Sequence, residues 1–150
     1  RRQTAGFRPP PHAYLTAHAD LIVPERQYGD PTAYGPYDLY WSEPERAPYW
    51  IVADGERAGF VLVNRYSASG RGCDAAIAEF HVADDRRRRG LGAAAAQAAF
   101  ATRGGLWELQ VFHANPAGAI FWPKVIAKAQ TRAWEQIRLD DRTIHRFRLR

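Results

Sequence analysis

The 150-residue sequence contains no methionine and one cysteine, Cys73. A single cysteine cannot form an intramolecular disulfide, which excludes a disulfide-stapled scaffold and is compatible with a reducing compartment. No apolar stretch approaches the roughly 20 residues that span a bilayer. Residues 1–11 lack the apolar segment of a secretory signal. These absences predict a cytoplasmic protein, and the lack of methionine leaves open that its natural start is missing or processed.

The Asp, Glu, His and Cys residues form no cluster in the sequence. They show no metal-ligand spacing, so we expect no metal. The formal net charge is +5, which favours anionic partners but does not separate a nucleic acid from a phosphorylated cofactor. A chain of this length buries roughly two thirds of its unfolded surface, so residues 1–150 are expected to form a single domain.

Hydrophobic periodicity and turn residues predict alternating strands and helices. A helix is expected over 12–23, and Asp54-Gly55 predicts a tight hairpin turn between two strands. Residues 75–83 are nearly all apolar, which is typical of a central strand covered on both faces. Pro123 predicts a kink or a late helix start. The other strands are expected at 49–54, 57–67 and 106–113, with helices at 90–105 and 116–130 and a closing hairpin through Asp140-Asp141. This order predicts an α/β fold around a mixed sheet.

The segment DDRRRRGLGAAAA, residues 84–96, joins a buried strand to a helix of small residues. The first amide groups of a helix have no acceptor within the helix, and the helix dipole adds positive potential there. Gly90 and Gly92 remove side chains that would keep a ligand from this backbone. The segment therefore predicts a cradle for a diphosphate.

This segment also resembles motif A of the GNAT superfamily of CoA-dependent N-acetyltransferases. Its Arg-x-x-Gly-x-Gly turn is matched by Arg87, Gly90 and Gly92, and Val82 stands at the usual apolar strand position. Downstream, NPAGAIFW matches the family's Asn-x-x-small-x-x-Phe-aromatic motif. The likeness covers roughly residues 37–149. It implies a mixed, mostly antiparallel central sheet flanked by helices, with splayed strands at the cofactor site.

The resemblance implies that this chain binds acetyl-CoA between the splayed strands. Backbone amides of the turn would hold the pyrophosphate, the Val82 backbone would pair with the pantetheine amides, and the Asn115 side chain would hydrogen-bond to the cofactor arm. Family members often dimerise, so a homodimer is one expectation. The implied cofactor-binding residues are Val82, Arg87, Arg88, Arg89, Gly90, Leu91, Gly92, Ala93 and Asn115.

Candidate catalytic groups follow from the strand AIAEFHV. Glu79 is the candidate general base, because a carboxylate is costly to bury without a role or a partner. A structural ion pair with a nearby arginine is the competing interpretation. Strand alternation puts His81 on the same side as Glu79. Trp122 stands where many family members carry the tyrosine that acts as general acid, and an indole cannot protonate a thiolate.

Two further questions stay open from sequence. The aromatic residues of 34–50 either line an acceptor pocket, holding an ammonium by cation–π contact, or fill the core. The segment RTIHRFRLR alternates arginine with apolar residues, which is typical of an edge strand with one solvated face. Its arginines, or those at 86–89, could bind nucleic acid. The three hypotheses are thus an N-acetyltransferase acting on an amine, a catalytically inactive acyl-CoA-binding regulatory module on the same fold, and a nucleic-acid-binding domain.

Overall fold

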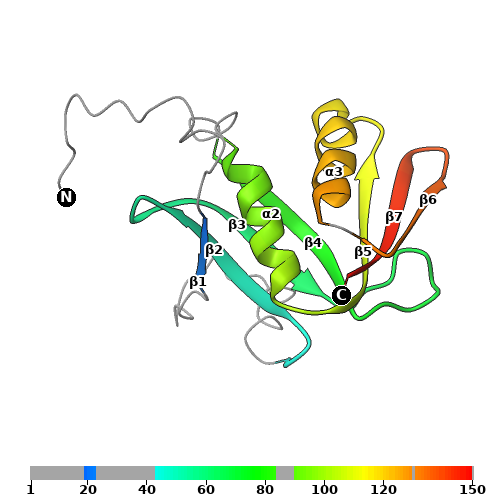
Figure 1. Cartoon of the computed structure of the whole chain (residues 1–150). Coiled ribbons are helices and arrows are strands. Elements are labelled where there is room, and N and C mark those ends of the chain that lie inside the picture. Colours follow the sequence, from blue (N-terminus) through cyan, green and yellow to red (C-terminus); the bar gives the residue numbers. More distant parts are fainter. Residues whose placement is uncertain (1–18, 23–42, 84–89, 130, 150) are drawn as a thin grey trace, which may run out of the picture.

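The computed structural model describes residues 19–22, 43–83, 90–129 and 131–149. Within this part of the chain the strands form one seven-stranded sheet in the order β1-β2-β3-β4-β5-β7-β6 (Figure 1). The strands are β1 (Asp20–Ile22), β2 (Ala47–Ala53), β3 (Glu56–Asn64), β4 (Ala75–Val82), β5 (Gly105–Phe112), β6 (Ala133–Arg138) and β7 (Arg142–Leu149). Every neighbouring pair is antiparallel except β4 and β5, so the sheet is mixed and mostly antiparallel, as expected.

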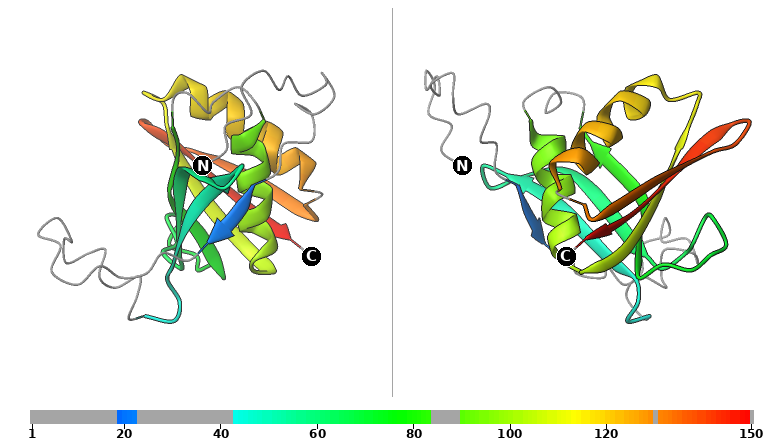
Figure 2. Two further views of the ribbon diagram at one scale, coloured as in Figure 1. Left: turned by 90° about the vertical axis from the view of Figure 1, so that its left-hand side faces the viewer. Right: turned by 45° about the vertical axis from the view of Figure 1, so that its right-hand side comes forward.

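Two helices cover one face of this sheet, which we call the helix face (Figure 2). They are α2 (Leu91–Ala101) and α3 (Pro116–Lys128). The α2 alanines at 95, 96 and 99 are fully buried, which lets the helix lie close to the strands. Phe100 of α2 packs edge-on against Trp107 of β5 and Phe147 of β7. The core therefore lies between the two helices and the sheet.

The β2–β3 hairpin follows its turn residues. Asp54 and Gly55 have positive φ values of 53° and 75°, the backbone that a tight two-residue turn requires. Gly59 then lets β3 approach β4 closely, because a Cβ at this position would overlap the carbonyl oxygen of His81. The hairpin predicted from Asp54-Gly55 is confirmed.

Three predicted elements differ from the structure. The helix expected over 12–23 is wrong at its end, where Asp20–Ile22 pairs with β2 as a strand; residues 12–18 lie outside the described part. α2 ends at Ala101 rather than 105, with Thr102 as its C-cap residue; the Thr102 hydroxyl donates to the Ala99 carbonyl at 2.6 Å. α3 begins at Pro116, capped by Asn115, so the late helix start expected from Pro123 is wrong, while the kink stays a prediction.

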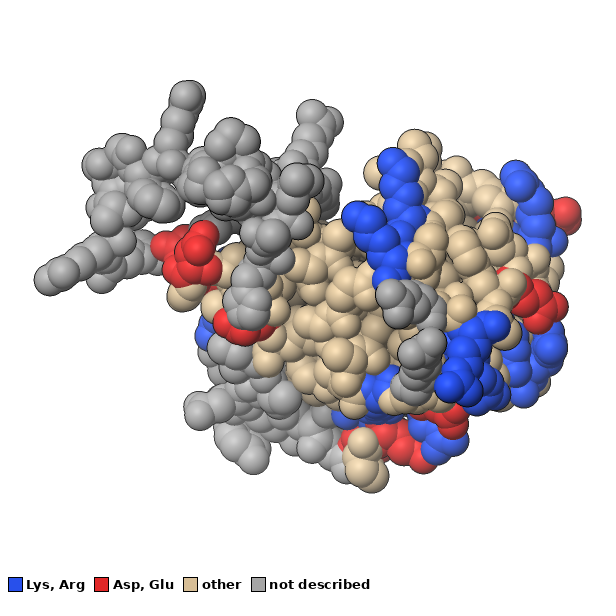
Figure 3. Space-filling view, viewed as in Figure 1, with Lys and Arg blue, Asp and Glu red and all other residues tan. Residues whose placement is uncertain are grey.

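The last strand also corrects an expectation. The tail RTIHRFRLR is β7, and β7 lies between β5 and β6 rather than at the edge of the sheet. Its Ile144, His145 and Phe147 are buried. Figure 3 shows Lys and Arg side chains over α3 and the β6–β7 hairpin, while the surface of α2 carries few. The basic excess of the sequence is thus unevenly spread over this side of the molecule.

Candidate functional site

A β-bulge in β4 decides which side chains face away from the helices. Leu62 of β3 pairs with Glu79 and the next residue, Val63, pairs with Ile77, so Ala78 is an extra residue on β4. One extra residue inverts the alternation of a strand. Ile77 before the bulge and Val82 after it both belong to the buried core. The bulge thereby directs Glu79 and His81 to the opposite side of the sheet, which we call the Glu79 face.

The two central strands part soon after they meet. β4 and β5 pair only at Ala75↔Trp107 and Ala76↔Glu108 among the described residues. β4 continues to Val82 and β5 to Phe112 without further ladder pairs between them. The edge of β4 that points toward β5 therefore has no β5 ladder partner over residues 77–82. A gap of this kind between parallel strands leaves backbone groups that an extended ligand can pair with.

The start of α2 lies at the end of β4 that borders this gap. Gly90 precedes the helix with φ 75° and ψ 3°, a left-handed backbone that favours glycine. The first intrahelical bond runs from the Ala94 N–H to the Gly90 carbonyl, at 3.0 Å. The N–H groups of Leu91, Gly92 and Ala93 have no acceptor within the helix. No acidic residue lies in this first turn.

Gly92 also serves the packing of the two helices. A Cβ at this position would lie 3.2 Å from Cε1 of Phe121 and 3.8 Å from Cγ2 of Val82. Its missing side chain therefore makes room for the Phe121 ring of α3, and its part in cofactor binding stays a prediction. Its backbone N–H stays among the first amides of α2. Arg87, Arg88 and Arg89, predicted as phosphate contacts, lie outside the described residues.

Asn115 caps the second helix. Its Oδ1 accepts a hydrogen bond from the Gly118 N–H at 3.0 Å, and a side chain on Gly118 would meet the Asn115 amide. Because Oδ1 is committed to the cap, only the Nδ2 group of Asn115 is left to donate to a ligand. Asn115 follows β5 and is exposed, so it lies at the β5 end of the gap.

A protein-family model matches most of this chain. The model is described as "Acetyltransferase (GNAT) family" and matches residues 15–124, more than half of the chain. The chain belongs to the GNAT acetyltransferase family. The match begins before residue 37, so the family likeness starts earlier than the motifs alone indicated. A search of curated proteins found no match.

Solved structures share the fold of this acetyltransferase family member. An acetyltransferase from Thermus thermophilus is 17% identical with a TM-score of 0.58, covering 76% of this chain and 71% of that one. A Bacillus subtilis acetyltransferase in complex with CoA is 14% identical with a TM-score of 0.54, at 89% and 97% coverage. A GNAT family acetyltransferase from Elizabethkingia anophelis with acetyl-CoA bound is 13% identical with a TM-score of 0.54, at 98% and 95% coverage.

Trp122, which the resemblance puts at the family's tyrosine position, is a packing residue in this GNAT protein. It is 8% exposed and contacts Phe80 and Phe121 edge-on, with ring centroids 5.0 and 4.9 Å apart. An indole N–H so placed is not an acid for a leaving thiolate. Of the aromatic cluster, Tyr49 packs against the core and Trp50 lies 4.6 Å from the Arg57 guanidinium. The residues of that cluster between 34 and 41 lie outside the described part.

Glu79 and His81 share the Glu79 face, as strand alternation predicts. Both are exposed, so the expectation that β4 is covered on both faces is wrong. Glu79 therefore carries no burial cost that a catalytic role would have to explain, because the bulge turns its carboxylate toward solvent. The case for Glu79 as the base therefore rests on its location: it follows the bulged Ala78, beside the point where β4 and β5 part.

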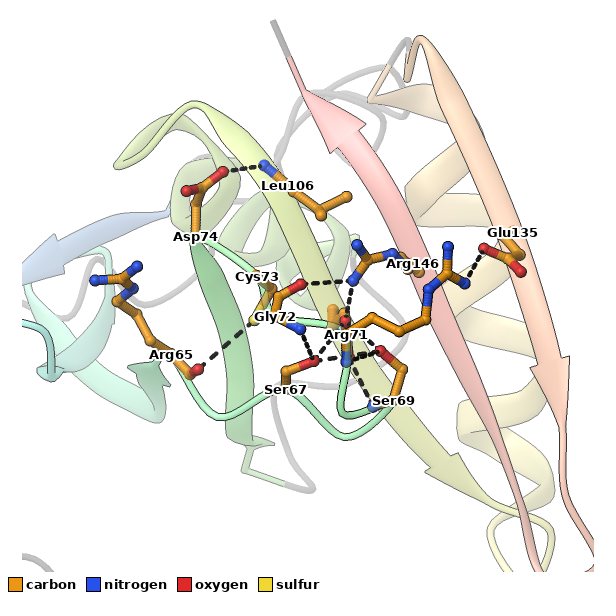
Figure 4. A network of polar contacts seen from close by, with 11 residues as sticks. Arg65, Ser67, Ser69, Arg71, Gly72, Cys73, Asp74, Leu106, Glu135 and Arg146 are labelled. Carbon is orange, nitrogen blue, oxygen red and sulfur yellow. Dashed lines mark hydrogen bonds and ion pairs between the residues drawn. The ribbon is translucent and has the colours of Figure 1, made fainter.

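The buried carboxylate of this region is Glu108 of β5, which the sequence patterns did not single out. It is fully buried and accepts hydrogen bonds from the Ser69 N–H at 3.0 Å and from the Ser69 and Ser67 hydroxyls at 2.8 and 2.9 Å. Arg146 of β7 completes the set with an ion pair (Figure 4). Burial raises the pKa of Glu108, but these hydrogen bonds together outweigh burial and leave the pKa below its ordinary value.

This network fixes the loop between β3 and β4 on the Glu79 face. Arg146 also donates to the Gly72 carbonyl at 2.6 Å, and the Gly72 N–H donates to the Ser67 hydroxyl at 3.1 Å. The signal that could have found the network is the strand LWELQVF, where Glu108 and Gln110 interrupt an apolar run. The partner, Arg146, could not have been chosen among the arginines of the tail.

Cys73 lies at the border of this network. Burial raises the pKa of its thiol to about 11, and the nearby Glu108 charge adds to the effect. A thiol with a raised pKa is a poor nucleophile. In the described part of the chain, no three His, Cys, Asp or Glu residues could jointly hold a metal ion. None of the described helices is long and apolar enough to cross a membrane.

Proposed function

We propose that this GNAT family member transfers an acetyl group from acetyl-CoA to a primary amine. The observation that carries the proposal is the parting of β4 and β5 after two residue pairs, with the first turn of α2 beside the open end. Anions bind well at helix N-termini, and a strand edge without a neighbouring strand suits the amides of an extended ligand arm. Family membership supports the same cofactor, and two of the similar structures contain CoA or acetyl-CoA.

In this proposal the backbone supplies most of the binding. The N–H groups of Leu91, Gly92 and Ala93 hold the diphosphate, and Gly90 turns the chain toward it. The edge of β4 up to Val82 pairs with the pantetheine amides, and Asn115 donates from Nδ2 to the arm. The side chains of Arg87, Arg88 and Arg89 add positive charge next to this turn.

The reaction then needs positioning and one proton acceptor. The amine nitrogen attacks the thioester carbonyl carbon, the C–S bond breaks, and the CoA thiolate leaves with the electron pair. Glu79 is proposed to take the proton that the nitrogen loses, directly or through water, because it stands beside the bulge. Trp122 cannot protonate the thiolate, so that proton comes from water or from another group.

A binding experiment tests the cofactor part. Calorimetric titration should give a micromolar dissociation constant for acetyl-CoA. Gly90→Asp should weaken binding at least tenfold, because a carboxylate beside the first amides of α2 repels the diphosphate. Gly55→Asp is the matched control, since Gly55 has the same φ of 75° with nothing within 4 Å of an added Cβ. Equal affinity for Gly90→Asp and Gly55→Asp would contradict the proposed site.

A second experiment separates an enzyme from a binding module. Release of free CoA thiol is followed with acetyl-CoA and a panel of primary amines. Amine-dependent thiol release supports acetyl transfer. Binding of acetyl-CoA with no thiol release for any amine would favour the inactive regulatory module. The buried Trp122 supports that alternative, because it cannot act as the general acid.

A further inference from the structure

The two edges of the sheet differ in how much backbone they leave open. β1 forms one edge and has three residues. β6 forms the other edge with six residues, which pair with β7 in an unbroken register. Natural edge strands are often kept from further pairing by shortness, proline or a bulge, and the β6 sequence AWEQIR has none of these. β6 is therefore the edge suited to accept another strand.

Every second residue of β6 points its backbone groups away from β7. At the turn of the hairpin, the Leu139 N–H donates to the Arg142 carbonyl at 2.8 Å. Because hydrogen-bonded and non-hydrogen-bonded positions alternate along an antiparallel pair, Trp134, Gln136 and Arg138 direct their N–H and C=O groups outward. No described segment pairs with this side of β6, which lies at the border of the sheet in Figures 1 and 2. The outer side of β6 is thus a row of backbone donors and acceptors.

We propose that this edge binds the β6 edge of a second copy of the chain, antiparallel and about a two-fold axis. Strand addition of this kind gains its affinity from main-chain hydrogen bonds. Two residues opposite each other across the pair lie on the same face of the sheet, so a two-fold axis must pass at one residue of β6 and its own counterpart. The proposal does not depend on acetyl transfer.

The side chains of β6 select the residue at the axis. A centre at Glu135 puts two carboxylates directly opposite each other, which is destabilising. A centre at Gln136 puts two amide side chains opposite each other, and an amide both donates and accepts hydrogen bonds. The backbone groups of Gln136 also point outward, so the two copies exchange hydrogen bonds at the axis itself. Centres nearer either end of β6 leave most of the strand unpaired, which makes Gln136 the centre.

The centre at Gln136 also matches the neighbouring side chains. Trp134 pairs with Phe147, whose ring packs on α2, so Trp134 and Arg138 both lie on the helix face. The pairing places the exposed Arg138 of one copy opposite the partly buried Trp134 of the other, and a guanidinium stacks favourably on an indole. Next to the strand, it places Leu139, which is 40% exposed, opposite Ala133. Surface left uncovered in one copy is thus covered by the other.

The size of the contact sets the expected affinity. One pair of six-residue strands is smaller than the roughly 800 Å² per partner of a standard interface, so the dimer should dissociate at micromolar concentrations. Sedimentation velocity of the full chain over a hundredfold range of concentration should show a monomer–dimer equilibrium. A wild-type chain that stays monomeric throughout would overturn the proposal and leave this edge open to a strand of another protein.

A proline variant tests the interface. Gln136→Pro removes the N–H at the axis, and because this N–H points away from β7 the variant keeps the β6–β7 hydrogen bonds. Its dimer dissociation constant should rise at least tenfold. Gln136→Thr is the matched control, since it keeps the N–H and a side chain that favours strands, and its dissociation constant should stay within threefold of wild type. Urea unfolding checks that both variants are folded, and equal dimerisation of the two would overturn the interface.

A disulfide experiment tests the register, and it decides the case if the proline variant does not fold. With the centre at Gln136, Glu135 of one copy lies opposite Ile137 of the other, at a non-hydrogen-bonded position where Cα atoms are about 4.5 Å apart, within the reach of a disulfide. In a Cys73→Ser background, Glu135→Cys and Ile137→Cys chains mixed under mild oxidation should cross-link to each other at least tenfold faster than either does to itself. Mass spectrometry identifies the mixed dimer. No preference for the mixed dimer would overturn the pairing.

Discussion

Glu79 and Glu108 lie on neighbouring strands and face the same side of the sheet, yet their surroundings are opposite. Glu79 is exposed beside a bulge in β4, whereas Glu108 of β5 is fully buried and receives four hydrogen bonds. Both interrupt an apolar strand in the sequence. The difference shows two ways in which a fold can accommodate a carboxylate in an apolar strand. A strand irregularity can turn the carboxylate toward solvent, or a set of hydrogen-bond donors can offset the cost of burying its charge. Glu79 lies at the surface of the sheet, whereas Glu108 holds the β3–β4 loop in the fold.

The largest effect is expected from removing the cation of the buried pair. Arg146→Met leaves the fully buried Glu108 without its ion-pair partner, and breaking such a pair costs about 3–5 kcal/mol of the free energy of unfolding. Urea unfolding measures this loss. Arg71→Met is the matched control, because Arg71 pairs with Glu135 at 2.8 Å with both side chains about half exposed. Its cost should lie within about 1 kcal/mol, and similar losses for the two variants would contradict the contrast.

The sequence predicts the parts of this region that are local. The Asp54-Gly55 turn, the alanine-rich helix and the N-terminal Pro116 of α3 each depend on neighbours within a few residues, and the structure has all three. The strand boundaries agree to within a few residues for the same reason. The turn at Gly90 was found because a glycine pair after an apolar strand is itself a local pattern.

What depends on pairing between distant segments could not be predicted. The bulge at Ala78 comes from the register of β4 on β3, and no residue type announces it. The donors to Glu108 lie 38 to 41 residues away along the chain. The tail was expected to be an edge strand, but it forms β7, which lies between β5 and β6. Three residues of β1 were too few to distinguish a strand from the end of a helix.

The next largest effect is kinetic and concerns Glu79. If its carboxylate takes the proton from the amine, Glu79→Gln should lower kcat about 100-fold, or about 2.7 kcal/mol of activation free energy. Its free energy of unfolding should stay within about 0.5 kcal/mol of wild type, because the side chain is exposed. Initial rates with a saturating amine and urea unfolding provide the two measurements. A wild-type rate in the Gln variant would remove Glu79 as the base.

Glu108→Gln should show the reverse pattern. It removes the charge that holds Arg146, so it should lower stability while the protein that remains folded keeps its acetyl-CoA affinity. Calorimetry on this variant, at a temperature where it is folded, gives the comparison. A strong loss of acetyl-CoA affinity without loss of stability would mean that Glu108 acts in cofactor binding and not in the fold.

The smallest effect is the pH dependence of stability. The folded state lowers the pKa of Glu108 through its hydrogen bonds, and burial lowers the pKa of His145. In both cases the unfolded state binds more protons, so stability rises with pH. We expect the free energy of unfolding to fall gently below about pH 6.5, where unfolded histidine protonates, and more steeply below about pH 4.5. Glu108→Gln should flatten the lower limb only, and an unchanged acid limb would contradict the lowered pKa.

The central claim, that the cofactor lies between the parted ends of β4 and β5, can be tested by amide hydrogen exchange with and without acetyl-CoA. Peptides covering residues 77–82 and 91–94 should exchange more slowly when acetyl-CoA is present, because those backbone groups gain hydrogen-bond partners. The β2–β3 turn at residues 53–56 should be unaffected. Slower exchange elsewhere in the sheet, with residues 77–82 and 91–94 unchanged at saturating acetyl-CoA, would contradict the account.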